Sequence, residues 1–94
     1  MSVLADITVF PVGVGESVHQ HVKKAVDRVK ESGLPHRVGP MGTTVEGEFS
    51  QVMDVIAKCH HALAQHANRV YMVVKIDSRK GPMGRLEAKV KAVE

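Results

Sequence analysis

The stretch G-P-M-G-T-T-V-E-G-E at residues 39–48 lies near the middle of the chain, and the other elements are arranged around it. Its first four residues predict a tight turn, because glycine adopts positive φ at little cost and proline fixes φ at about −65°. Residues 43–48 alternate with a period of two, which predicts a short strand. Thr43 should face one side of this strand, and Thr44 and Glu46 the other. We therefore expect the fold and the binding site to meet at this strand.

The chain before this stretch predicts a strand, a helix and a second short strand. Residues 3–11 alternate as a strand that ends at Pro11. An amphipathic stripe of valine and alanine then predicts a helix that begins at Ser17, in a capping box with Gln20, and ends at Gly33. A brief strand at residues 36–38 leads into the turn.

The chain after residue 48 predicts a helix, a strand and a final helix. Residues 49–66 form the first helix, within which we expect Cys59 to be a packing residue. Residues 70–77 have the strongest strand pattern in the chain, and residues 85–93 predict a short final helix. One face of the helix over residues 49–66 is expected to carry the side chains that pack on the sheet, which are Phe49, Val52, Met53, Ile56, His60, Leu63 and Ala64.

This order of elements predicts an α+β fold, a ferredoxin-like βαββαβ sandwich. A four-stranded antiparallel sheet would carry two helices on one face, with the short C-terminal helix added. Residues 1–94 are taken as a single domain. The uncovered face should mix aromatic, aliphatic, hydroxyl and carboxylate side chains. Such a face favours self-association of sheets, with a polar pocket at its margin.

Composition narrows the functional class. The formal net charge is +3 and the chain has three aromatic residues, too few basic and stacking groups to favour nucleic acid as a partner. A single cysteine excludes an intramolecular disulfide and favours a reducing compartment. We see neither an apolar run of about 20 residues that could span a bilayer nor a signal peptide. These features predict a cytoplasmic protein without a membrane partner.

Metal and dinucleotide sites are not predicted. The chain has six histidines, but none forms an i, i+4 pair on one helix with a supporting carboxylate. His60 and His61 are adjacent and should point to different faces of their helix. The V-G-V-G run at residues 12–15 lacks the full glycine spacing of a dinucleotide-binding loop.

Several parts of the chain resemble the small thiamine-binding protein family, which is related to the YkoF-type binders of hydroxymethylpyrimidine and thiamine. The most specific match is Thr43-Thr44-Val45-Glu46-Gly47-Glu48, and weaker matches are Val9-Phe10-Pro11, Gly33-Leu34, Val38-Gly39-Pro40, Arg69-Val70, Ile76-Asp77 and Glu87-Ala88-Lys89-Val90. The resemblance covers nearly the whole chain. It implies a cytoplasmic ferredoxin-like protein without a known reaction, which forms homodimers or homotetramers through its sheets.

The resemblance also implies a ligand and its binding residues. Thr43, Thr44 and Glu46 would belong to the motif that binds thiamine or its pyrimidine part, with Phe10 and Ser17 beside the ligand. This chemistry is reasonable, because a carboxylate can pair with the thiazolium cation and threonine hydroxyls both donate and accept hydrogen bonds. An aromatic ring can stack on a flat or cationic ring.

Three functions follow as hypotheses. The first is a non-enzymatic binding protein for thiamine or hydroxymethylpyrimidine, acting in vitamin B1 metabolism without a further cofactor. The second is an oligomeric regulatory or structural module that binds an anion at a subunit interface through Arg69, Arg79 and Lys80. The third is an enzyme of the dimeric ferredoxin-like barrel type, for which Asp6 and His36 are the available acid–base residues.

Overall fold

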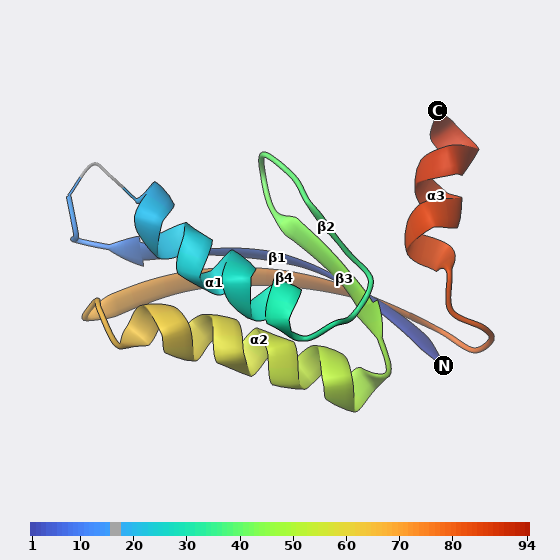
Figure 1. Cartoon of the computed structure of the whole chain (residues 1–94), viewed down its shortest axis with the longest axis horizontal. Coiled ribbons are helices and arrows are strands. Elements are labelled where there is room, and N and C mark those ends of the chain that lie inside the picture. Colours follow the sequence, from blue (N-terminus) through green and yellow to red (C-terminus); the bar gives the residue numbers. More distant parts are fainter. Residues whose placement is uncertain (16–17) are drawn as a thin grey trace.

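The computed structural model describes residues 1–15 and 18–94 of the chain. Its elements follow the order expected for an α+β ferredoxin-like fold with an added C-terminal helix, which confirms that prediction (Figure 1). In chain order they are β1 (Ser2–Val12), α1 (His19–Glu31), β2 (His36–Val38), β3 (Thr43–Gly47), α2 (Phe49–Ala64), β4 (Arg69–Arg79) and α3 (Arg85–Val93).

The four strands form one antiparallel sheet in the order β2-β3-β1-β4. β1 is central, and it pairs with β4 along its whole length but with β3 over its first half alone, since the β1–β3 register ends where Ile7 lies opposite Thr43. The turn after β2 is closed by a hydrogen bond from Gly39 N to Gly42 O (2.9 Å). Neither Gly39 nor Gly42 has a positive φ, so the turn forms where it is predicted but without the positive φ expected for its glycines. The β2–β3 hairpin therefore leaves β1 near Thr8.

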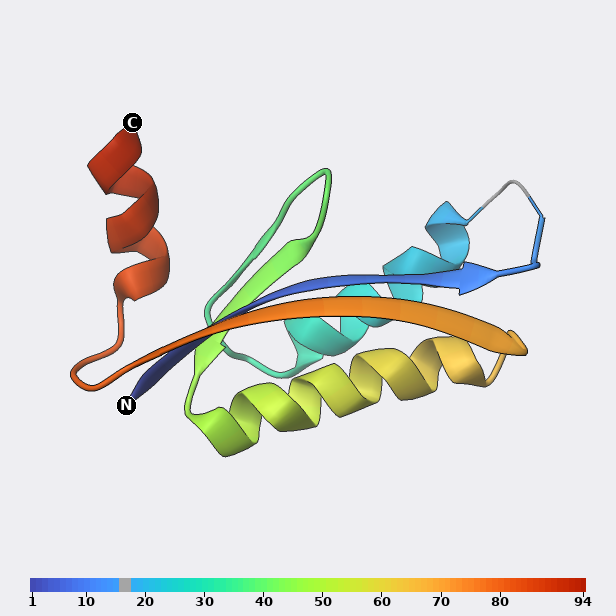
Figure 2. The same cartoon turned by 180° about the vertical axis from the view of Figure 1, so that it is seen from behind.

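The core lies between the sheet and the pair α1 and α2, which cover the same face (Figures 1 and 2). Alternate residues of β1 point into it, and Val3, Ala5 and Ile7 are almost fully buried. A fully buried side chain of the size of valine or isoleucine contributes about 1.5–3 kcal/mol. The alternation of β1 seen in the sequence is thus confirmed.

The buried face of α2 differs from the predicted one. The buried residues of α2 are Val52, Val55, Cys59, Ala62 and Leu63. The expected core residues Phe49, Met53, His60 and Ala64 are exposed instead. Apolar side chains extend past both margins of the stripe, so the periodicity permits more than one rotation of the helix. Packing against α1 selects the face that contains Cys59, whose Sγ donates to Ala25 O (3.4 Å).

β4 is an edge strand, and its apolar face is covered unevenly. Met72 and Val74 pack against the core, whereas Ile76 is 44% exposed because it lies beyond the part of the sheet that the helices cover. The helix α3 stands at this same end, beside the N-terminus (Figure 2). Its first residues contact β3 and β1, while Val93 near its end is 85% exposed.

The remaining sequence predictions concern the cap of the first helix and membrane crossing. The helix cap assigned to Ser17 lies outside the described residues, and α1 is described from His19 onward. No helix in the described part of the chain combines the length and the apolar character that crossing a bilayer requires.

Candidate functional site

A cavity of about 290 Å³ opens where the β2–β3 hairpin leaves β1. Beyond Ile7, the β3-facing side of β1 has no strand partner among the described residues, and α1 and the hairpin turn border the gap. The cavity is lined by Ile7, Thr8, Val9, Phe10, Val22, Ala25, Val26, Val29, Val38, Gly39, Pro40, Met41, Gly42, Thr43 and Cys59.

The hairpin turn is held tightly against β1. Thr8 Oγ1 donates a hydrogen bond to Met41 O (2.9 Å). A Cβ atom added at Gly42 would lie 3.0 Å from both Thr8 Oγ1 and Asp6 Oδ1, so only glycine lets the backbone come this close. Gly42 therefore sets the distance between the turn and β1 and shapes the rim of the cavity.

The chemistry of the lining suits a flat, mostly apolar molecule with a few polar atoms. The valines come from α1, β1 and β2, and the hydroxyls of Thr8 and Thr43 lie among them. Phe10 adds an aromatic ring, which stacks on Tyr71 with 5.4 Å between ring centroids and 23° between ring planes. Cys59 lines the cavity too, and burial raises the pKa of its thiol to about 11.

The structure brings together two of the five residues predicted to bind the ligand. Phe10 and Thr43 line the cavity, and Ser17 lies outside the described residues. Thr44 points to the opposite face of the sheet, where its Oγ1 donates to Asp6 Oδ1 at 3.4 Å. Glu46 shares that opposite face and lies outside the cavity.

The carboxylate of Glu46 has a structural role. It is 1% exposed and accepts a hydrogen bond from Ser2 Oγ at 2.6 Å. It also accepts the backbone N–H groups of Gly84, Arg85 and Leu86 at 3.0, 3.1 and 3.2 Å, which are the first N–H groups of α3. A carboxylate at a helix N-terminus satisfies donors that have no partner inside the helix. These donors contact both oxygens of Glu46, and the ligand contact predicted for this residue stays a prediction.

The same bonds determine how Glu46 titrates. Burial raises the pKa of this carboxyl, but the hydrogen bonds from Ser2 and from the N–H groups of Leu86, Arg85 and Gly84 lower it further than burial raises it. The net direction is a pKa below the ordinary value of 4.5. Glu46 is therefore an anionic carboxylate at neutral pH, and it holds the start of α3 against the sheet through these hydrogen bonds.

Arg85 also attaches α3 to the sheet, a role that the sequence patterns did not predict. Its guanidinium donates to Ser2 Oγ (3.0 Å), Ser2 O (2.9 Å), Asp77 O (2.8 Å) and Asp77 Oδ2 (3.0 Å). Hydrogen bonds from Arg85 and Lys89 hold the pKa of Asp77 below its usual value. The one available signal was the position of Arg85 at the start of a predicted helix, which does not identify partners so distant in sequence.

The basic residues proposed for an anion site do not form one cluster within the chain. Arg69 and Arg79 are the two ends of β4. Ten steps along a strand at about 3.3 Å each separate them by about 33 Å. Lys80 lies next to Arg79, so a single chain cannot bring all three to one ligand. Among the described residues, no group of three histidine, cysteine or carboxylate side chains is placed to hold a metal ion.

Comparison with known proteins gives one consistent family. The model of a family described as thiamine-binding protein matches residues 5–94. The chain is 41% identical over 95 residues to the UPF0045 protein Mb1933 of Mycobacterium bovis, across 100% of this chain and 93% of that protein.

Two solved structures share the fold over the whole length. The hypothetical protein MJ1052 of Methanocaldococcus jannaschii superposes with a TM-score of 0.89 at 33% identity, covering 98% of this chain and 95% of that one. The Thermotoga maritima protein TM0486, whose name assigns it provisionally to thiamine biosynthesis or salvage, gives a TM-score of 0.87 at 31% identity and covers 100% of both chains.

Proposed function

Because this chain belongs to the thiamine-binding protein family, we propose that it binds thiamine or its hydroxymethylpyrimidine part in the cavity beside β1, without catalysing a reaction. The observation that carries the proposal is the lining of this cavity. It joins the predicted ligand residues Phe10 and Thr43 to the hydroxyl of Thr8 and to a wall of valines. A flat aminopyrimidine can lie against the valines, and the hydroxyls can meet its ring nitrogen and amino group.

Asp6 replaces Glu46 in this proposal as the group that meets the thiazolium cation. Its Oδ1 lies beside Gly42 at the rim of the cavity, and its carboxylate is partly exposed. The ion pair that it makes with Lys75 is long (3.9 Å), and an exposed pair of this kind is worth about 1 kcal/mol or less. A bound cation can therefore compete with Lys75 for this carboxylate.

Binding without catalysis is supported by the titratable groups of the cavity. Among the described residues that line the cavity itself, Cys59 is the one that titrates, and its pKa of about 11 keeps it a neutral thiol near neutral pH. Asp6 at the rim is assigned to the cation of the ligand, so the described lining supplies no second acid or base to act with it. A neutral buried thiol is a poor nucleophile and a poor general base. Storage, transport or sensing of the vitamin in the cytoplasm fits this chemistry.

Self-association through the sheet is part of the proposal. Phe10, Tyr71 and Val73 lie on the sheet face away from α1 and α2 and are 38%, 49% and 48% exposed. β4 also leaves one edge of the sheet without a strand partner in the described part of the chain. Apolar exposed sheet faces and open edges are typical sites of association, so a homodimer or homotetramer is expected.

Isothermal titration with thiamine and, separately, with hydroxymethylpyrimidine tests the proposal. Adjacent threonines provide matched variants, because Thr43 lines the cavity and Thr44 faces the other side of the sheet. Losing one ligand hydrogen bond should make Thr43→Val bind hydroxymethylpyrimidine about tenfold more weakly. Thr44→Val should change the affinity for this uncharged ligand less than about threefold, because the hydroxyl of Thr44 contacts Asp6, which is assigned to the thiazolium cation alone.

A third variant tests the charge contact. Asp6→Asn should weaken thiamine by about tenfold and leave the uncharged pyrimidine nearly unchanged. Absence of heat with both ligands from the folded wild-type protein would overturn the proposal. Equal losses of hydroxymethylpyrimidine affinity in Thr43→Val and Thr44→Val would mean that the ligand does not bind in this cavity.

A further inference from the structure

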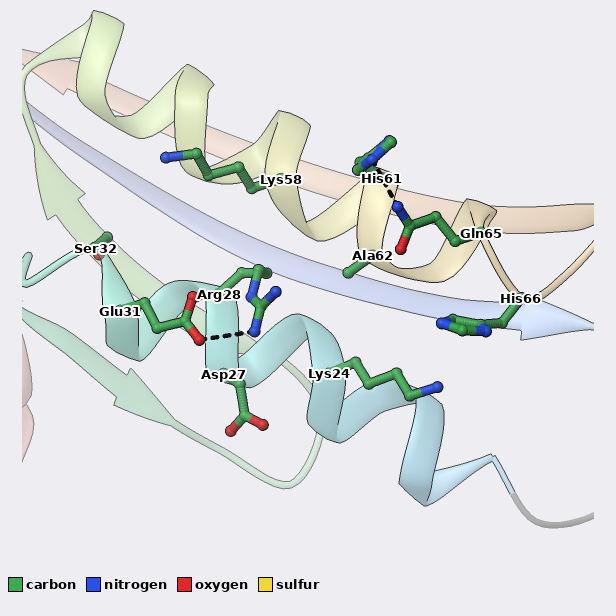
Figure 3. A pocket seen from close by; sticks show the side chains of 10 residues that line it. All are labelled: Lys24, Asp27, Arg28, Glu31, Ser32, Lys58, His61, Ala62, Gln65 and His66. Carbon is green, nitrogen blue, oxygen red and sulfur yellow. Dashed lines mark hydrogen bonds and ion pairs between the residues drawn. The ribbon is translucent and has the colours of Figure 1, made fainter.

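A second cavity lies on the outer side of the helix layer, in the groove between α1 and α2 (Figure 3). Its volume is about 440 Å³, which falls within the range of small-molecule sites. It is separate from the cavity beside β1, because α1 presents valines and Ala25 to that cavity and charged residues to this groove.

Basic and hydrogen-bonding side chains reach the groove from both helices. Lys24 and Arg28 are four residues apart on α1 and share one face, as do His61 and Gln65 on α2. His66 follows α2 and lines the same groove. Figure 3 shows the guanidinium of Arg28 between the two helices.

The carboxylates that line the groove are neutralised by neighbouring cations. Asp27 pairs with Lys23 (3.1 Å), and Figure 3 shows its side chain pointing away from α2. Glu31 pairs with Arg28 (2.7 Å) through one guanidinium nitrogen, Nη2. Lys58, which also lines the groove, pairs with Asp54 (2.9 Å), so Lys24 is the lining cation without an ion pair among the described residues.

Two groups of α1 have donors to spare. Lys24 is half-buried and forms no ion pair or side-chain hydrogen bond with the described residues. Nε of Arg28 is buried and has no hydrogen-bond partner among them either. Buried donors without an acceptor are rare in native proteins, because leaving one unpaired is costly.

We propose that this groove binds the phosphate group of a small phosphomonoester. The guanidinium of Arg28 matches phosphate oxygens with its planar set of donors, and Lys24 adds a point charge. Gln65 Nε2 and His61 Nε2 share a hydrogen bond (2.9 Å), which leaves the second N–H of the Gln65 amide, the other ring nitrogen of His61 and the ring of His66 to meet the ester. The volume exceeds what a bare phosphate fills, so the remaining part of the groove holds the polar organic part of the ester.

Titration with glycerol 3-phosphate and with inorganic phosphate at constant ionic strength tests this site. We expect saturable one-to-one binding of the ester, and weaker binding of inorganic phosphate. Lys24→Gln should weaken the ester about tenfold, because it removes one charge-assisted contact. Lys30→Gln is the control: this exposed lysine of α1 lies outside the groove and should change affinity less than about twofold.

Two further measurements separate a built site from diffuse attraction. Arg28→Lys keeps the charge but loses the fork of donors, so it should also weaken the ester about tenfold while the variant stays folded by circular dichroism. The ring signals of His61 and His66 in nuclear magnetic resonance spectra should shift on binding, and those of His60 should not. Lys24→Gln should bind thiamine with the affinity of the wild type. The phosphomonoester site and the proposed thiamine site are therefore tested independently.

Three results would overturn the phosphomonoester site. Equal losses in Lys24→Gln and Lys30→Gln would mean that net charge alone attracts the anion. If inorganic phosphate bound as tightly as the ester, the groove would not recognise the organic part of the ester. Titration of either probe to high concentration without saturation would exclude the site altogether.

Discussion

Replacing Glu46 by glutamine should release the start of α3 from the sheet and lower the free energy of unfolding by about 3 kcal/mol. In the wild-type protein, one oxygen of this buried carboxylate accepts bonds from Ser2, Gly84 and Arg85, and the other accepts the N–H of Leu86. Glutamine keeps one acceptor oxygen, but its amide nitrogen can only donate. One donor must then face another in a site without access to water.

The magnitude follows from the four bonds. Hydrogen bonds to a charged acceptor are worth about 1.5–3 kcal/mol and those to a neutral acceptor about 0.5–1.5 kcal/mol, so three retained bonds lose roughly 3–4.5 kcal/mol together. The N–H of Leu86 left without an acceptor adds about 1–3 kcal/mol. Detachment of α3 lets water reach these donors and limits the total, which gives the value near 3 kcal/mol. For a domain of this size, it corresponds to a fall in Tm of about 12–24 °C.

Urea unfolding followed by circular dichroism, at one fixed protein concentration, measures the loss. Glu87→Gln is the control, because Glu87 is an exposed carboxylate in the first turn of the same helix. It should cost about 0.3–1 kcal/mol through the helix dipole alone. Hydrogen exchange adds a local readout, since the amides of Gly84, Arg85 and Leu86 should lose protection in Glu46→Gln before the amides of β1 do.

The reasoning would be refuted if Glu46→Gln cost no more than Glu87→Gln, or if exchange at residues 84–86 stayed at the wild-type rate. Either result would mean that Leu86 and Arg85 hold α3 without the buried carboxylate. Loss of thiamine binding in a Glu46→Gln variant of unchanged stability would restore the ligand role predicted from the sequence.

Three more predictions use neighbouring features. The pKa of Glu46 is lower in the folded than in the unfolded chain, so its stabilisation is fully present above about pH 4.5 and is lost as the pH falls through the folded-state pKa. The difference in unfolding free energy between wild type and Glu46→Gln should therefore shrink below pH 4.5. Cys59, with its raised pKa of about 11, should resist alkylation in the native protein and react at the rate of a free thiol in urea. Gly42→Ala should cost about 1–3 kcal/mol in urea unfolding and weaken thiamine binding, because the added Cβ would meet Asp6 and Thr8 at 3.0 Å; unchanged values would show that the turn can move away from β1.

The sequence predicted the elements well because each carries its own local signal. The bounds of β2 and α3 match those predicted, and a turn forms at residues 39–42, although its glycines do not adopt positive φ. The period of two placed each residue of β1 and β3 on the correct face of the sheet. These features depend on neighbours within a few positions, which a single sequence contains.

The features that the sequence did not predict depend on contacts between distant residues. The rotation of α2 is set by packing against α1, and the chain offers apolar residues on more than one side of that helix. The clamp of Glu46 on α3 joins residues 38 to 40 positions apart. The cavity beside β1 exists because β3 is shorter than β1, and its rim residues Thr8 and Gly42 carry no motif of their own.

The residues of the β3 strand, Thr43–Gly47, form one sequence motif but serve two different parts of the molecule. Thr43 lines the cavity and Val45 enters the core, whereas Thr44 and Glu46 serve the opposite face, where they contact Asp6 and α3. A match to this motif therefore reports the architecture of the sheet and its last helix at least as much as a ligand. Selectivity between thiamine and other small molecules should depend on cavity residues that the motif does not include, and Thr8, Phe10 and Asp6 are where we expect it to be determined.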